Sequence, residues 1–191
     1  MCATSIGPTR RAFTHIDQTG ERTITIIGDK FRPRGDDAAL PWHELKDFDG
    51  VYFVSGDIQS LQRARQARVL VGAARELGTL LVAGVQLDAL VGSALDAGER
   101  YEPDSLDPPP GLVVATSSHL GGWAQPGGPF EAAAKPGPVQ DSNGAGDCFA
   151  AGLTFALARG DEYRDALALA ARCGATVVTG RGAYGRQLRG E

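Results

Sequence analysis

Short, unbroken apolar runs most constrain the fold of this sequence. Residues 51–54 and 112–116 are of this kind, and Val51, Phe53, Val113 and Val114 are among them. Strands that are covered on both faces carry such runs, and they are typical of parallel sheets flanked by helices. The sequence therefore predicts an α/β fold, a doubly wound sheet with helices on both faces.

Apolar residues at helical spacing follow the first run. They predict a helix over residues 61–77 that has Ser60 as its N-cap and stops at Gly78. Residues 79–83 are then predicted to be the next strand of a β-α-β unit, and residues 87–97 a short helix. Two later stripes predict a pair of C-terminal helices: Phe149, Leu153, Ala156 and Leu157, then Tyr163, Leu167, Ala170, Ala171 and Gly174.

A second pattern lies near the N-terminus. Residues 12–16 and 22–27 alternate polar and apolar side chains around a Gly-containing turn at residues 17–21. This pattern predicts a β-hairpin with one covered face. We therefore predict a lid-like β-hairpin over residues 9–29 and an α/β core over residues 47–188.

Composition narrows the class of protein. Of the 191 residues, 42% are hydrophobic and 22% are charged, as is typical of a globular protein. The net charge of −4 argues against a nucleic-acid partner, because such proteins usually carry a basic face. We expect no membrane partner and a cytoplasmic location, because no run approaches the ~20 apolar residues of a membrane helix. The three scattered cysteines, Cys2, Cys148 and Cys173, fit a reducing compartment and show no metal-ligand spacing.

The segment that carries chemistry is residues 141–147, Asp-Ser-Asn-Gly-Ala-Gly-Asp, just before a predicted helix. Gly144 and Gly146 let the backbone turn sharply and approach a ligand. The first amides of a helix have no partner within it, and the helix dipole is positive there. These features predict a phosphate site beside Asp147. A Gly-rich turn with a capping aspartate explains the same residues, and local chemistry leaves both interpretations open.

Two better-known phosphate motifs do not fit this segment. A Walker A loop needs Gly-Lys-Ser/Thr, which does not follow Gly146. A dinucleotide fingerprint needs a strand–loop–helix start near the beginning of the fold, and this segment lies near the C-terminus without such a start. A nicotinamide-dependent oxidoreductase is therefore disfavoured.

Residues 141–153, Asp-Ser-Asn-Gly-Ala-Gly-Asp-Cys-Phe-Ala-Ala-Gly-Leu, resemble the C-terminal signature of the PfkB/ribokinase-type carbohydrate kinases. That signature has an Asp, two variable residues, Gly-Ala-Gly-Asp, and then a Phe and a Gly along the helix. Residues 179–183 stand where the family has its closing loop, and the hairpin resembles its lid strands. The resemblance implies a ribokinase-like fold, ATP as phosphoryl donor, and a small-molecule sugar or nucleoside as substrate.

The resemblance also assigns roles around the loop. Asp147 would be the general base that takes the proton of the attacking hydroxyl. The amides of Gly144, Ala145 and Gly146, with that of Asp147, would form an anion hole for the ATP phosphates. Thr116, together with Gly121, looks like the family's nucleotide-contacting strand end.

A monovalent-cation site is implied beside the loop. Asp141 and Asn143 match positions that help to hold a cation such as K⁺ in ribokinase-like proteins. Backbone oxygens near Val177 and Gly182 would complete that site. Arg186 stands near the place where the family often has a serine, and its charge is an alternative to the cation.

Two departures from the family pattern concern the substrate and the metal. The resemblance starts at the lid strands, so the sequence predicts an N-terminally truncated sheet without the family's Gly-Gly sugar-binding motif. Such a sheet exposes an edge, and a homo-oligomer is one expected consequence. Asn143 is the only asparagine, so the Asn-x-x-Glu motif that organises Mg²⁺ in many members is absent. Mg²⁺ is still expected with ATP, and Glu99 or Asp96 is an alternative ligand through water.

The sequence thus supports two hypotheses of function. The first is a PfkB-type kinase that phosphorylates a hydroxyl of a sugar or nucleoside with ATP. The second is a non-catalytic nucleotide-binding fragment or subunit of such a kinase, which the two departures favour.

Other charged residues are interpreted without a ligand. Arg10 and Arg11 beside the hairpin are expected to be a solvated basic pair, and Asp88, Asp96 and Glu99 a solvated helix face. His15, His43 and His119 lack the pairing of a metal site, and His119 is the one closest to the predicted nucleotide strand.

Overall fold

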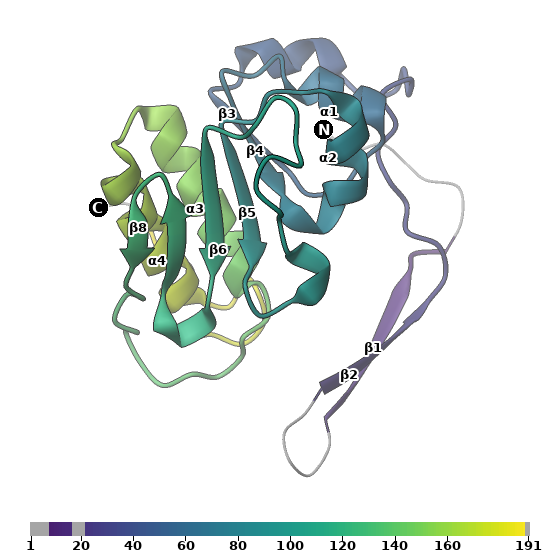
Figure 1. The fold of residues 1–191 in the computed structure, drawn as a ribbon. Helices are drawn as coiled ribbons and strands as arrows, with labels where there is room; N and C mark the ends of the chain where they lie inside the picture. Colours follow the sequence, from purple (N-terminus) through teal and green to yellow (C-terminus); the bar gives the residue numbers. More distant parts are fainter. Residues whose placement is uncertain (1–7, 17–21, 190–191) are drawn as a thin grey trace.

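A six-stranded sheet forms the centre of the protein, in a computed structural model that describes residues 8–16 and 22–189 (Figure 1). Its strands are β3 Gly50–Phe53, β4 Val69–Ala73, β5 Ala89–Ser93, β6 Leu112–Thr116, β7 Gly122–Gln125 and β8 Gly128–Phe130, in this order across the sheet. β3 to β6 are parallel, and β7 and β8 add an antiparallel edge. The predicted α/β class is confirmed.

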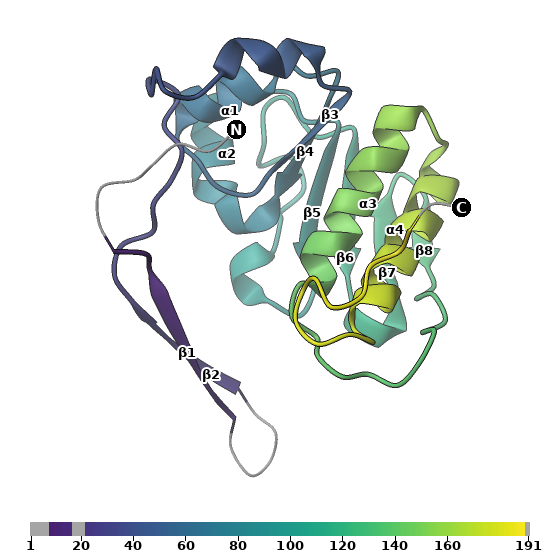
Figure 2. The same cartoon turned by 180° about the vertical axis from the view of Figure 1, so that it is seen from behind.

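Helices cover both faces of this sheet, as Figures 1 and 2 show from opposite sides. α1 Ile58–Ala64 and α2 Leu77–Ala83 lie on one face, and α3 Ala145–Arg159 and α4 Tyr163–Val177 lie on the other. Side chains of β4 alternate between the two layers: Leu70 packs towards α1 and α2, and Val71 towards α3 and α4. Both are fully buried, and each such side chain stabilises the fold by about 1.5–3 kcal/mol. Central strands therefore need apolar residues at every position, which explains the unbroken runs.

The predicted N-terminal strands form a separate antiparallel pair. β1 Arg11–Ile16 and β2 Arg22–Ile27 are paired with Arg11 opposite Ile27, and the pair stands apart from the six-stranded sheet in Figure 1. The predicted turn at residues 17–21 lies outside the described residues, as does Cys2. The prediction of a covered face is wrong, because Phe13 (58% exposed) and Ile24 (57%) face solvent.

Three predicted elements between residues 58 and 97 are of the wrong type. The predicted helix over residues 61–77 covers the end of α1, which stops at Ala64, and then the strand β4. The predicted strand at residues 79–83 lies within the helix α2. The predicted helix at residues 87–97 contains the strand β5. In α2, Leu80 is buried whereas Leu81 and Val82 are exposed, the one-sided burial of a surface helix. A strand buried on both faces satisfies helical spacing as well, so periodicity could not separate the two types.

The N-cap of α1 also differs from the prediction. The Asp57 carboxylate, and not Ser60, caps the helix: it accepts the Ser60 N–H at 2.7 Å and the Gly35 N–H at 3.0 Å. One carboxylate thus closes the helix start and fixes the loop that leads from the hairpin to the core.

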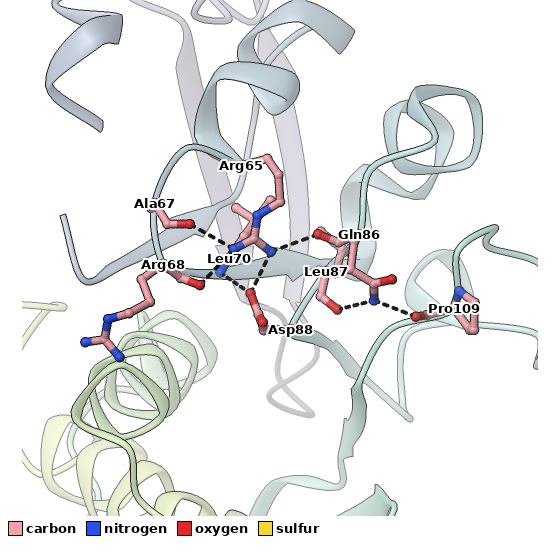
Figure 3. Close-up of polar contacts among 8 residues, drawn as sticks. All are labelled: Arg65, Ala67, Arg68, Leu70, Gln86, Leu87, Asp88 and Pro109. Atoms are coloured by element: carbon pink, nitrogen blue, oxygen red, sulfur yellow. Dashed lines mark hydrogen bonds and ion pairs between the residues drawn. The ribbon is translucent and has the colours of Figure 1, made fainter. Parts of the chain in front are cut away.

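The amino end of the parallel strands is held by Arg65 at the end of α1 (Figure 3). Its guanidinium donates to the Asp88 carboxylate at 2.7 Å and to the Gln86 carbonyl at 3.0 Å, and also to the carbonyls of Ala67 and Arg68. Asp88 in turn accepts the Leu70 N–H at 2.7 Å. Asp88 therefore joins α1, β4 and β5, and its predicted place on a solvated helix face is wrong.

Short 3₁₀ helices connect several of the strands and helices. η1 Trp42–Asp47 is a 3₁₀ helix before β3, and shorter 3₁₀ turns are η2 Ala74–Glu76, η3 Ala97–Glu99 and η4 Ser118–Leu120. Within residues 8–16 and 22–189, no helix has both the length and the apolar character that crossing a bilayer requires.

Candidate active site

The predicted phosphate loop leads into α3, on the side of the sheet where the parallel strands end. The helix begins at Ala145, so Asp147 lies in its first turn and not at its start. Gly144 is the N-cap, with a φ of +82° that favours glycine. A Cβ on Gly144 would come within 2.6 Å of the Ala183 Cβ, so the loop and the C-terminal segment close on each other there.

A cavity of about 390 Å³ opens beside this helix start. It is lined by residues from β6, the turn after it, the segment before α3, and both C-terminal helices: Thr116, Ser118, His119, Gly121, Phe130, Ala132, Ala133, Lys135, Val139, Ser142, Ala145, Gly146, Phe149, Ala171, Gly174, Ala175 and Val178. Four of the predicted site residues, Thr116, Gly121, Ala145 and Gly146, therefore share one cavity. Its volume falls in the range of small-molecule sites.

Glycine is required where the cavity meets η4. Gly121 has a φ of +89°, and a Cβ there would lie 2.0 Å from the Phe130 carbonyl oxygen. Thr116 ends β6, and its hydroxyl donates to the Gly92 carbonyl at 3.2 Å. Gly146, by contrast, has nothing within 4 Å of its Cβ position, so its backbone is open to a ligand.

The cavity wall combines apolar surface with polar groups at its rim. Phe130 and Phe149 stack with ring centres 5.8 Å apart. Among the described lining residues, none is acidic, whereas His119 and Lys135 can carry positive charge. Lys135 escaped the sequence analysis because it lies in a Gly/Pro-rich segment without periodicity.

The Asp147 side chain is exposed. Its negative charge influences Tyr52 on β3 and Arg75 in η2. Burial, and then the negative charge of Asp147, raises the pKa of Tyr52 on β3 to about 12. Burial lowers the pKa of Arg75 in η2, but Glu99 and then Asp147 and Tyr52 raise it, and the net direction is upward. Tyr52, Arg75, Glu99 and Asp147 thus influence one another electrostatically, and we call these four residues the transfer cluster.

An ion pair fixes the middle of the transfer cluster. The Arg75 guanidinium lies 2.8 Å from one Glu99 carboxylate oxygen, and the other oxygen accepts the Ser93 N–H at 2.9 Å. The Glu99 side chain is 11% exposed, so its predicted place on a solvated helix face is wrong. Sequence periodicity missed the pair, because the strands β4 and β5, which precede the 3₁₀ turns that carry these residues, were assigned the wrong element type.

The residues predicted to hold a monovalent cation are brought together. The Asp141 carboxylate accepts the Asn143 N–H at 2.9 Å and the Gly182 N–H at 3.0 Å. Val177 ends α4, and its carbonyl accepts the Gly180 N–H at 3.0 Å. Arg186 is exposed, and its Nη1 lies 3.6 Å from the Cβ position of Gly137. Asp141 thus ties the loop before α3 to the loop after α4.

A divalent metal held mainly by protein side chains does not fit the described residues. Among them, no three or more His, Cys, Asp or Glu side chains are grouped as metal ligands would be. Both Glu99 oxygens already accept contacts, one from Arg75 and one from Ser93. Proteins bind Mg²⁺ through one or two carboxylates plus substrate phosphates, so here it would have to enter with the nucleotide.

Cys148 follows Asp147, and its thiol is not activated by the helix start. Burial, Cys173 and Asp147 raise the pKa of the Cys148 thiol, and burial also raises that of Cys173. Neither of these two free cysteines is poised as a nucleophile.

The C-terminal part of the chain matches the model of a known family. Residues 112–188 match the pfkB family carbohydrate kinases, and this confirms the family predicted from residues 141–153. The match includes the strand end at Thr116, the loop before α3, and the segment that closes on Gly144. No protein of curated function matches the sequence.

Solved structures show the same fold. The chain is similar to a ribokinase from Thermotoga maritima (TM-score 0.68, 18% identity, 92% of this chain and 65% of that one). It is also similar to a Burkholderia thailandensis nucleoside kinase in complex with inosine (0.71, 17%, 92% and 62%). A third is a Cryptococcus neoformans ribokinase in complex with ADP (0.64, 19%, 92% and 67%). The predicted ribokinase-like fold is therefore confirmed, and the chain spans 62–67% of the length of these three proteins.

Proposed function

We propose that the chain transfers the γ-phosphoryl group of ATP to a hydroxyl of a sugar or nucleoside. The observation that carries this proposal is the junction of a 390 Å³ cavity with the start of α3, where the Gly146 backbone is open. Free amides and the positive helix dipole at that start favour phosphate. The pfkB match over residues 112–188 includes both features.

In this proposal the nucleotide occupies the cavity with its phosphates on the amides of Gly144, Ala145, Gly146 and Asp147. The adenine packs on the apolar wall near Phe149, and Thr116 and Gly121 bound the opposite side. The Asp141 site would bind K⁺ and so steady the loop before α3. The ADP in the Cryptococcus neoformans ribokinase and the inosine in the Burkholderia thailandensis nucleoside kinase support these substrate classes.

The chemistry assigned to Asp147 is general-base catalysis. Its carboxylate accepts the proton of the acceptor hydroxyl as that oxygen forms a bond to the γ-phosphorus. The bond between the γ-phosphorus and the bridging oxygen breaks, and ADP leaves with that electron pair. Mg²⁺, when bound with the nucleotide, supplies charge neutralisation on the phosphates.

A coupled assay of ADP release across a panel of sugars and nucleosides tests this function. The wild type should release ADP with at least one acceptor, and Asp147→Asn should lower kcat by about 100-fold or more, because a placed base contributes ~10²–10⁴. The amide keeps the shape of the side chain, so its folding should be unchanged. Equal ADP release by the wild type and the variant would refute the role of Asp147.

A non-catalytic nucleotide-binding role is the second candidate. It is favoured by the absence of a carboxylate group for a metal within the described residues. Calorimetric titration with ATP distinguishes the two functions: binding without ADP release across the whole panel would support the non-catalytic role.

A further inference from the structure

Arg75 is a basic residue without a role in the proposed mechanism, and it stands at the carboxyl ends of the strands, as the predicted base Asp147 does. It belongs to η2, directly after β4, whose carboxyl end lies between those of β3 and β5. Its side chain remains 52% exposed although Glu99 holds it, so much of the guanidinium still faces outward. An arginine guanidinium has five N–H donors, and an ion pair with one carboxylate leaves donors for a second anion.

The orientation of Arg75 is built into the fold from two sides. Glu99, nearly buried and itself held by the Ser93 N–H, contacts the guanidinium at 2.8 Å. The next residue, Glu76, is buried and paired with Lys30 at 2.8 Å and with Arg32, both from the segment that follows the hairpin. The turn that carries Arg75 is therefore fixed on both sides.

Packing places the start of α3 towards the carboxyl ends of β3 and β4, and η2 follows β4 at that same end. A Cβ on Gly50 would lie 3.0 Å from side-chain atoms of Thr154 and Ala158, so the beginning of β3 packs on the late turns of α3. Tyr52 points to the same side as Gly50 and lies about 6–7 Å further along the strand. α3 runs the opposite way, so Tyr52 lies towards its first turns, where Asp147 is.

We propose that Arg75 binds the phosphoryl group during its transfer and neutralises the negative charge that develops on it, with Glu99 as the residue that positions it. This inference rests on the proposed function, since Asp147 must hold the acceptor hydroxyl within hydrogen-bond reach. The phosphorus lies one bond beyond that oxygen, at the carboxyl ends of the strands where both Asp147 and Arg75 stand.

The side chain of Arg75 matches the chemistry of its proposed ligand. Guanidinium suits this position, because its planar donors match the oxygens of a phosphoryl group and its charge does not titrate near neutral pH.

Tetrafluoroaluminate with MgADP, which imitates the phosphoryl group in transfer, separates this inference from the proposed function. Calorimetry should show that the wild type binds MgADP at least about 10-fold more tightly with tetrafluoroaluminate than without it. Arg75→Met should bind MgADP alone as the wild type does, yet lose most of that gain. Steady-state assays should show a fall in kcat of about 100-fold or more with little change in KM for ATP.

Three further variants keep this test informative. Arg63→Met, an exposed arginine in α1, makes the same change of net charge far from the cluster and should behave as the wild type does. Arg75→Lys should recover part of the gain, and the double variant Arg75→Met/Glu99→Gln avoids an unpaired carboxylate if Arg75→Met folds poorly.

The outcomes distinguish the two proposals. A wild type that gains nothing from tetrafluoroaluminate overturns the proposed phosphoryl transfer and this inference with it. A wild type that gains, together with an Arg75→Met/Glu99→Gln variant that gains equally, overturns the role of Arg75 alone.

Discussion

Gly146→Ala offers a clean separation of ligand binding from stability. Nothing lies within 4 Å of the Gly146 Cβ position, and the residue is in the first turn of α3. Alanine is favoured over glycine in helices by up to ~1 kcal/mol, so the free energy of unfolding should be unchanged or slightly higher. The added methyl group, however, enters the space where the proposed phosphates meet the helix amides.

The expected loss of affinity follows from that methyl group. Forcing one extra carbon into a fitted contact costs about 1–3 kcal/mol, which corresponds to a 5- to 150-fold rise in the Kd for ATP. Calorimetry would measure the Kd, and urea unfolding the stability. A Gly146→Ala protein that binds ATP as tightly as the wild type would refute the placement of phosphates on this helix start.

Gly144→Ala is the matched contrast. Its φ of +82° and the 2.6 Å approach to Ala183 mean that alanine would add backbone strain and a steric overlap. The two terms together should lower the free energy of unfolding by ~2–5 kcal/mol. Equal stability of the Gly144 and Gly146 variants would contradict the described loop conformation.

Two more predictions concern the frame of the fold. Asp57→Ala should cost about 1 kcal/mol at pH 7, because the carboxylate caps α1. Burial raises the Asp57 pKa, but the backbone N–H groups of Ser60 and Gly35 lower it, and the net direction is downward. The stabilisation is therefore present above the unfolded pKa of about 4 and is lost as the pH falls through the folded pKa. Urea unfolding of the wild type and variant should give curves that converge in acid, and a difference independent of pH would contradict the cap. Arg65→Met should cost about 1–3 kcal/mol through the broken contacts with Asp88 and the carbonyls, whereas Arg63→Met should stay within ~0.5 kcal/mol. Equal losses in these two variants would show that the network in Figure 3 adds nothing.

Sequence patterns predicted the correct type of element where a helix is buried on one side only or where a turn needs particular residues. α3 and α4 show apolar stripes because their outer faces meet solvent, and the loop at Gly144 and Gly146 is marked by its glycines. The middle of the chain carried no such asymmetry. β4 is buried at every position, and such a run satisfies both helical and strand spacing.

The residues of the candidate site were likewise predicted only where a sequence motif marks them. Thr116, Gly121, Ala145 and Gly146 were predicted from motifs, and the fold gathers them at one cavity. Tyr52, Arg75 and Glu99 lie near one another only because the carboxyl ends of the parallel strands β3, β4 and β5 are neighbours in the sheet. No local sequence pattern encodes that arrangement. Wrong element types for β4 and β5 therefore hid the transfer cluster, whereas a glycine loop leading into a helix was predicted where the structure has the start of α3.

A crystal structure with a non-hydrolysable ATP analogue tests the central claim most directly. We expect the phosphates of the analogue to lie on the amides of residues 144–147 at the start of α3. Its adenine ring should lie in the cavity between Gly121 and α4. A nucleotide bound elsewhere, with this cavity empty, would contradict the account.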